Sequence, residues 1–378
     1  MRNAVLLIGM FLIVSVFTSC RSENKVDPER LKQITEEEKE EEEVEVDSLP
    51  EVKFKRVYIN SAKELSRLRE QYSFADKDAP AHRAITTINR KEFRFFQVGD
   101  TIVEPDQIYG ELKYYSIFPT YYKEARHIPK LVVVSAKYQC YACYEKGVIV
   151  YYAAANTGKE SSQTYPGRYN INWKHKDHCS SIDDGWRMPY TVNFHLRAGN
   201  AFHQYSMQGR PRSHSCVRQF MQDAKWIFYW TDRGRLAVDS VTKCLYATRL
   251  GTMVLIIDAF DYARKRFGPW LDITDNKSVY LPMPEDPENY EWPFIPIKQL
   301  VGGAVGLPGG YDRYKYAEDT LRARGILRPE VVITSAAQTR RQKKIREQRA
   351  AADAAKRELE AGKTEENATS KATEGHNK

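Results

Sequence analysis

Short apolar runs separated by turn signals fill the middle of the chain. Residues 131–134, 138–144 and 148–152 are rich in β-branched and aromatic side chains, and Glu145-Lys146-Gly147 between the last two runs is a hairpin turn signal. A last apolar run at residues 252–257 follows an aromatic stretch at 220–231 that predicts a helix. The pattern therefore predicts a mainly β unit with some α+β character at about residues 130–258.

The first twenty residues carry a different pattern. They begin with a positive charge at Arg2, continue with an apolar core at residues 4–17, and end in the small residues Thr18-Ser19-Cys20. This order is typical of a signal peptide, and the apolar core is too short for a membrane-spanning helix. The end of the core also resembles a bacterial lipobox, which implies a lipoprotein that begins at Cys20 and carries its lipid there. The alternative is an ordinary cleaved signal with an incidental cysteine.

Two segments separate this signal from the β unit. Residues 21–50 are acidic, with glutamate at almost every position from 36 to 45, and self-repulsion predicts an extended tether. Residues 51–129 are globular in composition and show helical spacing at 62–72. They predict a small accessory α+β domain.

Three segments on the C-terminal side add to the β unit. Residues 232–250 form an insertion between the predicted helix and the last strand, with no function assigned. Residues 259–335 are rich in proline and aromatic side chains, which predicts an extended segment packed on the β unit. Residues 336–378 predict a charged, solvated helix followed by a disordered end.

The net charge of the chain limits the kinds of partner that are expected. The chain has 378 residues and a formal net charge of +8, with a pI near 8.9. An exported protein is not expected to meet nucleic acid, whereas a basic surface suits a cell-envelope polymer that carries carboxylates. We therefore predict a protein of the cell envelope, anchored by lipid on the periplasmic side.

Six cysteines are present, four of which lie outside the lipobox and the site described below: Cys140, Cys143, Cys179 and Cys244. Cys140 and Cys143 are three apart in a predicted strand, so they face opposite sides and do not form a local disulfide. A zinc site that adds His175 and His178 matches no usual ligand spacing. We predict buried free thiols or one disulfide pair, with no metal and no cofactor.

Residues 203–218 concentrate the side chains that can do chemistry. They read HQYSMQGRPRSHSCVR, with His203 thirteen residues before Cys216 and Arg218 two residues after it. A cysteine is nucleophilic as the thiolate, and at neutral pH an unperturbed thiol is mostly protonated. An imidazole can accept the thiol proton, and guanidinium charge favours the thiolate. The alternative is a basic loop around a buried, unreactive cysteine.

This stretch resembles the active-site motif of L,D-transpeptidases of the YkuD type, which has an upstream His-Gly and then Ser-His-Gly-Cys-hydrophobic-Arg. Ser213, His214, Cys216 and Arg218 fall on the second part, and His203 falls on the upstream histidine. Two positions depart from the pattern, because Gln204 and Ser215 stand where the family has glycine. A glycine can adopt backbone angles that a serine resists. Further similarities at residues 156–159, 164–169 and 188–194 extend the resemblance over about 130–258.

The resemblance implies a β-sandwich-like fold and a role for each residue. Cys216 is the nucleophile and His203 the base, while the amides of Ser215 and Cys216 form the oxyanion hole. The supporting residues are Ser213, His214 and Arg218, and the candidate pocket wall is Tyr190. His195, on a predicted strand, is interpreted as a structural histidine. Papain-like peptidases fit less well, because they place the cysteine before the histidine.

Residues 89–105 resemble the second half of a LysM module, with an asparagine, an apolar stretch, Gly-Asp and a strand that ends in proline. LysM modules bind the glycan strands of peptidoglycan. The implied protein is thus a YkuD-like catalytic domain preceded by a small LysM-like domain, acting on peptidoglycan stem peptides to form 3→3 crosslinks. An L,D-carboxypeptidase and a non-catalytic peptidoglycan-binding lipoprotein are the two alternatives.

Overall fold

The computed structural model describes residues 48–180, 185–196, 198–241, 243, 245–263, 268–291, 301, 318–332, 341–355 and 357. The predicted signal peptide with Cys20, most of the acidic tether, Cys244 and the predicted disordered end lie outside these residues. Residues 341–355 are helical and almost entirely exposed, as the charged composition predicts. None of the helices in the described ranges has the length and apolar character needed to cross a membrane.

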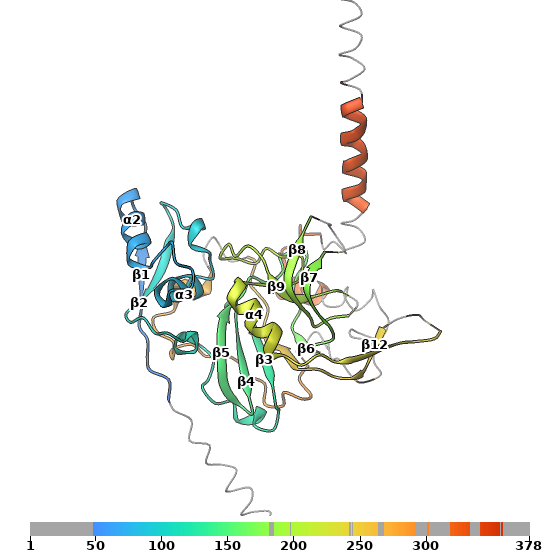
Figure 1. The fold of residues 1–378 in the computed structure, drawn as a ribbon, viewed down its shortest axis with the longest axis horizontal. Coiled ribbons are helices and arrows are strands. Elements are labelled where there is room, and N and C mark those ends of the chain that lie inside the picture. The colour runs from blue at the N-terminus through green and yellow to red at the C-terminus, as the bar shows by residue number, and fades with distance from the viewer. Residues whose placement is uncertain are drawn as a thin grey trace, which may run out of the picture. The chain divides into compact units, whose positions relative to one another are not determined.

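Two sheets form the centre of the fold (Figure 1). The first has the order β5-β4-β3-β13-β6, in strands β3 (Leu131–Ser135), β4 (Cys140–Glu145), β5 (Val148–Ala154), β6 (Gly167–Asn170) and β13 (Met253–Ile256). The second has the order β10-β9-β8-β7, in strands β7 (Lys174–Cys179), β8 (Arg187–Asn193), β9 (Ala201–Gln204) and β10 (Val217–Gln219). The sheet-rich fold is confirmed, as is the hairpin turn, where Lys146 and Gly147 have φ of 47° and 81°.

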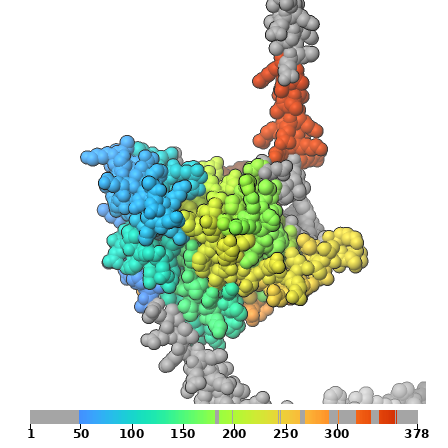
Figure 2. All heavy atoms as spheres, viewed as in Figure 1, coloured from blue at the N-terminus to red at the C-terminus, as the bar shows by residue number. Residues whose placement is uncertain are grey.

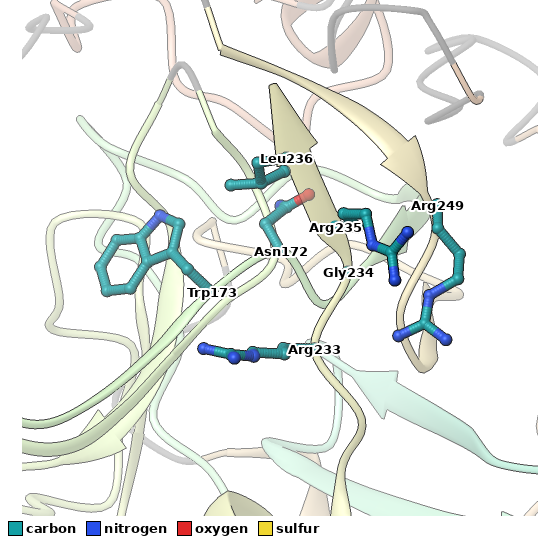
Figure 3. A pocket seen from close by; sticks show the side chains of 7 residues that line it. All are labelled: Asn172, Trp173, Arg233, Gly234, Arg235, Leu236 and Arg249. Atoms are coloured by element: carbon teal, nitrogen blue, oxygen red, sulfur yellow. The ribbon is translucent and has the colours of Figure 1, made fainter. Parts of the chain in front are cut away.

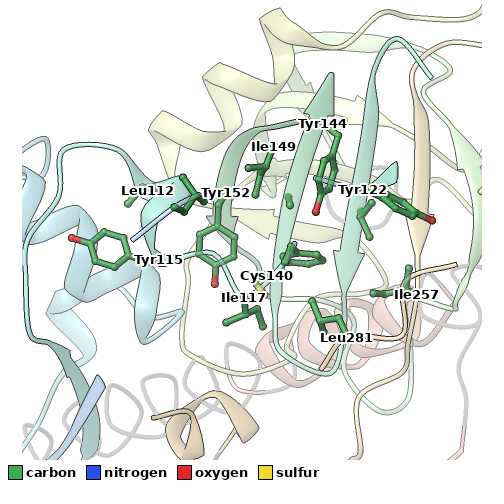
Figure 4. Close-up of a cluster of buried hydrophobic side chains, with 14 of the residues drawn as sticks. Leu112, Tyr115, Ile117, Tyr122, Cys140, Tyr144, Ile149, Tyr152, Ile257 and Leu281 are labelled. Carbon is green, nitrogen blue, oxygen red and sulfur yellow. The ribbon is translucent and has the colours of Figure 1, made fainter. Parts of the chain in front are cut away.

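The first sheet is buried on both faces. One face packs against the second sheet and against α4 (Met221–Trp230), through a cluster that contains Val132, Phe202 and Ile227. The other face is covered by segments that precede and follow the sheet in the sequence, including Leu112 and Leu281 (Figure 4). Burial on two sides explains why β3 is an unbroken apolar run rather than an alternating one.

Cys140 and Cys143 of β4 belong to opposite cores. Cys140 lies in the cluster under the N-terminal segments, and Cys143 lies in the cluster between the sheets. Both are free thiols in the structure. The prediction that they face opposite sides of the strand is confirmed, and this placement excludes a bond between them.

A small α+β unit precedes the sheets, in the order β1 (Phe54–Tyr58), α2 (Ala62–Gln71), α3 (Pro80–Ile88) and β2 (Thr101–Pro105), with β1 and β2 antiparallel. The helical spacing at 62–72 is confirmed by α2, which Ser61 caps through its hydroxyl. The second helix was not predicted, although Pro80 in its first turn is a usual helix start. Short 3-10 helices follow at η1 (Phe93–Phe95), η2 (Leu112–Tyr115) and η3 (Lys123–Ala125).

The insertion at 232–250 forms a hairpin of β11 (Arg235–Val238) and β12 (Leu245–Arg249), which projects from the surface in yellow in Figure 2. The described part of the proline-rich extension packs on the first sheet. It contributes Trp270 and Leu271 of η4 (Pro269–Asp272) to the core, together with Leu281. Leu49, within the predicted tether, is also buried there, so the folded region begins before residue 51.

Candidate active site

Cys216 and His203 are brought to one face of the second sheet by strand register. β10 and β9 are parallel neighbours, with Val217 opposite Phe202 and Arg218 opposite His203. Val217 and Phe202 both point into the core between the sheets. Since successive side chains of a strand point to opposite faces, His203, Arg218 and the adjoining Cys216 lie on the other face. His203 and Cys216, which are thirteen residues apart in the sequence, are thus brought together by neighbouring strands.

Residues 156–159 hold the loop that carries the cysteine. Asn156 forms a bridge with Arg218, and Gly158 forms one with Ser213. Gly158 has to be glycine, because an added Cβ would lie 2.1 Å from the Ser162 carbonyl oxygen and 2.9 Å from Ser215 Cα. The Asn-Thr-Gly-Lys segment at residues 156–159 therefore packs directly against the cysteine loop and supports it.

The carbonyls of the loop are occupied by donors. The Ser213 hydroxyl donates to the Cys216 carbonyl, the Thr164 hydroxyl donates to the Ser215 carbonyl at 2.9 Å, and the Lys159 amide donates to the Ser213 carbonyl at 2.8 Å. In the described part of the chain, neither the Ser215 nor the Cys216 amide donates to a loop or side-chain acceptor. These two N–H groups are the donors that an oxyanion could use.

Ser215 adopts the left-handed conformation that the family glycine would allow, with φ of 76°. Its hydroxyl donates to Asn200 Oδ1 at 2.6 Å and also contacts the His214 carbonyl. The side-chain hydrogen bonds hold the serine in a backbone region that costs an L-residue about 1–2 kcal/mol. The departure from the family pattern changes the residue while the local backbone keeps the shape that glycine favours.

We expect Ser215→Gly to change the free energy of unfolding by less than about 1 kcal/mol, because relief of the positive φ offsets the lost hydrogen bonds and the greater freedom of the unfolded chain. Ser215→Val should lower it by about 2 kcal/mol, since a β-branched residue is strongly disfavoured at positive φ. Urea unfolding of both variants measures the difference. Equal effects would show that the left-handed geometry is not required.

Burial sets the protonation of both reactive groups. The pKa of His203 is lowered to about 4, mainly by burial and further by the charge of Arg218. The pKa of Cys216 is raised to about 11 by burial, which outweighs the amide of Ala201 and the charge of Arg218. At neutral pH the resting pair is a thiol and a neutral imidazole. The charge of Arg218 acts toward the thiolate, and desolvation, which favours the neutral thiol, is the larger effect.

The hydrogen bonds fit these protonation states. The Cys216 thiol points to the Gly199 carbonyl, with Sγ 4.0 Å from its oxygen. His203 Nδ1 is 2.9 Å from the Gln204 carbonyl oxygen, which can only accept, so Nδ1 carries the proton and Nε2 is the basic nitrogen. Gln204, at the second departure from the family pattern, therefore orients the histidine through its backbone.

Positive charge surrounds the loop. Lys159 Nζ is 3.1 Å from His214 Nε2, and the pKa of Lys159 is lowered by burial and by Arg218 and Arg212. Arg218 lies over the ring of Tyr205 at 4.6 Å, and its Nη1 is 3.5 Å from the Ser206 carbonyl oxygen. No carboxylate among the described residues forms an ion pair with Arg218 or Lys159.

Tyr190 and His195 do not meet the cysteine. The Tyr190 ring packs against Phe228 and Tyr229 of α4, at centroid distances of 5.6 and 6.3 Å. These contacts place the ring on the side of β8 that faces α4. His195 is buried beside Tyr169 and accepts a hydrogen bond from the Ala198 amide at 3.3 Å, so its contacts are those of a structural side chain.

A cavity of about 460 Å³ opens at the end of β9, where Gln204 and Tyr205 line it. It was not predicted from the sequence, because it combines residues from three strands and the segment after β9. Its lining residues are Asp177, Arg187, Pro189, Gln204, Tyr205 and Ser206. Three of them, Gln204, Tyr205 and Ser206, belong to the stretch at residues 203–218. In the described ranges no cluster of side chains fits a metal ion.

The fold and the site define a sheet-rich domain with a cysteine and a histidine on adjoining strands. Residues 129–256 of it match the YkuD family, described as the L,D-transpeptidase catalytic domain. No curated protein matches the chain.

Three solved structures show the level of similarity. An L,D-transpeptidase (Yku) from Stackebrandtia nassauensis is 22% identical, with 35% of this chain and 57% of that chain covered and a TM-score of 0.28. A structure of the L,D-transpeptidase from Xylanimonas cellulosilytica is 19% identical, with 54% and 97% covered and a TM-score of 0.32. L,D-transpeptidase 3 from Mycobacterium tuberculosis is 15% identical, with 43% and 76% covered and a TM-score of 0.26. The chain thus spans less than two thirds of the first of these structures.

Proposed function

We propose that the protein is a peptidoglycan L,D-transpeptidase that works through a thioester on Cys216. The observation that carries the proposal is the shared face of Cys216 and His203, beside two amides with no loop or side-chain acceptor, within a domain that matches the YkuD family. The cationic surroundings of the loop, with Lys159 and Arg218 lacking an ion-pair carboxylate in the described residues, suit a substrate that carries carboxylates.

The reaction follows in two balanced steps. Cys216 Sγ attacks the carbonyl carbon of the donor stem peptide while His203 Nε2 takes the thiol proton. The amides of Ser215 and Cys216 stabilise the oxyanion, the C–N bond breaks, and His203 returns the proton to the departing D-alanine amine. A side-chain amine of a second stem then attacks the thioester carbonyl and loses a proton to His203. The C–S bond breaks as the 3→3 crosslink forms, and His203 returns the proton to Cys216 Sγ, which restores the thiol.

The test is incubation of the purified protein with muropeptides, with the products read by mass. A crosslinked dimer with loss of D-alanine supports transpeptidation. Loss of D-alanine with gain of water would instead assign an L,D-carboxypeptidase. Unchanged muropeptides with retained binding would assign a non-catalytic binder.

The small α+β unit before the sheets is proposed to bind glycan strands. Its support is the LysM-like segment at 89–105, in which Asn89 bonds to the backbone of Val103 through both amide atoms, each at 2.8 Å. Retention of the chain on insoluble peptidoglycan, competed by soluble glycan fragments without peptides, tests this role. Competition by free stem peptides alone would exclude it.

We also propose that Cys20 is the lipidated first residue of the mature protein, held at the periplasmic face of a membrane. The support is the Phe17-Thr18-Ser19-Cys20 pattern after the apolar core. Cys20→Ala should move the protein from the membrane to the soluble fraction, because the lipid is then lost. Fractionation and immunoblotting measure this, with Cys179→Ser as the matched control. A Cys20→Ala chain that remains at the membrane with unchanged processing would disprove the lipobox interpretation.

A further inference from the structure

The β11–β12 hairpin and the segment before β7 enclose a cavity of about 380 Å³ that the candidate active site does not use (Figure 3). Three arginines and one tryptophan dominate its lining: Arg233, Arg235, Arg249 and Trp173. All three arginines come from the insertion at 232–250, which had no assigned function. The cavity therefore shows that this insertion forms an arginine-rich, positively charged surface.

The three guanidinium groups are exposed and have no carboxylate partner among the described residues. The adjoining acid, Asp232, is already paired with Lys130, with 3.1 Å between Oδ2 and Nζ. Arg235 and Arg249 are direct partners in the antiparallel register of the hairpin. Like charges directly opposite each other destabilise a strand pair, so an anion bound between them would remove an unfavourable interaction.

The base of the hairpin is held rigidly. The Gly234 amide donates to the Ile171 carbonyl at 2.9 Å, and the Thr252 amide donates to the Asp232 carbonyl at 2.9 Å. A Cβ added at Gly251 would lie 2.3 Å from the Ile171 oxygen and 2.4 Å from the Asp232 oxygen. The close backbone approach fixes where the arginines leave the surface. A site formed before its ligand arrives loses less entropy on binding.

The distribution of charge indicates the ligand. Figure 3 shows Arg235 and Arg249 together on one side of the cavity, whereas Arg233 extends toward Trp173. Phosphate sites gather their donors around one point. Here the positive groups are spread along the cavity, and the Trp173 indole adds a flat apolar wall, which fits separate carboxylates on a short chain with apolar stems between them.

We propose that this cavity binds an acidic peptide segment with at least two carboxylates. The identity of that peptide rests on the proposed function, under which it is a peptidoglycan stem containing D-glutamate and diaminopimelate. The site holds substrate at a place distinct from Cys216, so it contributes to substrate affinity and not to the chemical step.

The test uses the full chain and the dipeptide γ-D-glutamyl-meso-diaminopimelate, titrated in a calorimeter. We expect Arg235→Gln/Arg249→Gln to weaken binding by about tenfold or more, since two charge-assisted contacts are lost. Lys243→Gln, which removes a charge from the same hairpin outside the cavity, should stay within about twofold of wild type. Higher ionic strength should weaken wild-type binding more than binding by the double variant.

Two results would overturn the proposal. One is equal affinity of the double variant and the wild type for the dipeptide. The other is inorganic phosphate that binds as tightly as the dipeptide, which would indicate a general anion site. A thermal melt checks folding, and the double variant should melt no lower than wild type, because the like-charge pair is removed.

A carbapenem adduct on Cys216, measured in the same proteins, separates this proposal from the proposed function. The double variant should be acylated as fast as wild type. If wild type is not acylated while the dipeptide still binds and the double variant weakens it, the proposed function fails and the acidic-peptide site stands.

Discussion

A carbapenem should add to Cys216 and to no other cysteine of the chain. These compounds mimic the acyl donor of the family that the domain resembles. Cys140 and Cys143 are buried, with burial raising the pKa of both thiols. Cys179 is exposed, but it lies at the end of β7 and not in the loop whose amides form the proposed oxyanion hole. Intact-protein mass spectrometry with peptide mapping measures the adduct and its position.

Variants of the pair should separate nucleophile from base. Cys216→Ser should abolish the adduct, and His203→Ala should slow its formation by about 10²–10⁴-fold, the usual value of general-base assistance. Cys179→Ser is the control for a non-catalytic cysteine and should leave the rate unchanged. His195→Ala should reduce thermal stability more than rate. An adduct that persists in Cys216→Ser, or a His203→Ala chain with wild-type rate, would contradict the assigned roles.

The rate of acylation should depend on pH in a particular way. With the pKa of His203 near 4, the imidazole is neutral and able to accept a proton at any pH well above that value, and the rate should fall as pH drops through about 4. With the pKa of Cys216 near 11, the rate should rise again only as the thiolate forms at high pH. The acylation rate measured by stopped flow should change little with pH between these limits. A bell-shaped profile centred near neutral pH would instead indicate a preformed thiolate–imidazolium pair.

Arg83→Met should lower the free energy of unfolding by about 3–5 kcal/mol at neutral pH. Arg83, on α3, pairs with the fully buried carboxylate of Asp223 on α4, and Tyr151 donates to the same oxygen of Asp223 at 2.7 Å. Removing one partner leaves an uncompensated buried charge, which is the costly way to break such a pair. The pair also joins the small N-terminal unit to the sheet-rich domain. Its loss should therefore make the unfolding of these two parts less cooperative. Urea unfolding measures both effects.

The cost should depend on pH with a defined sign. Burial raises the pKa of Asp223, although Arg83 and Tyr151 act against it. Without Arg83 the carboxyl should hold its proton to still higher pH, so the destabilisation should shrink as pH falls and Asp223 becomes neutral. Arg187→Met, which removes a solvent-exposed ion pair with Asp177, is the matched control and should have a much smaller effect. Restoration of part of the loss by adding Asp223→Leu to Arg83→Met would confirm an unpaired charge as the cause.

The sequence by itself determined the elements whose signals are local. The strand at β3, the β4–β5 hairpin with its Lys146-Gly147 turn, the helix at α2 and the helix after the cysteine were all predictable, because each depends on periodicity, turn residues or capping within a few positions. The spacing of His203 and Cys216 also marked the reactive stretch. The family match at residues 129–256 agrees with the resemblance found in that stretch.

Tertiary structure alone decided what those residues do to one another. Parallel pairing of β9 and β10 puts His203 and Cys216 on one face, and burial of the thiol outweighs the lowering of its pKa by Arg218. Ser215 at positive φ, the orientation of Tyr190 toward α4 and the arginine-lined cavity likewise depend on contacts between distant segments. The physical reason is that register and desolvation are properties of neighbours in space, which local sequence patterns do not specify.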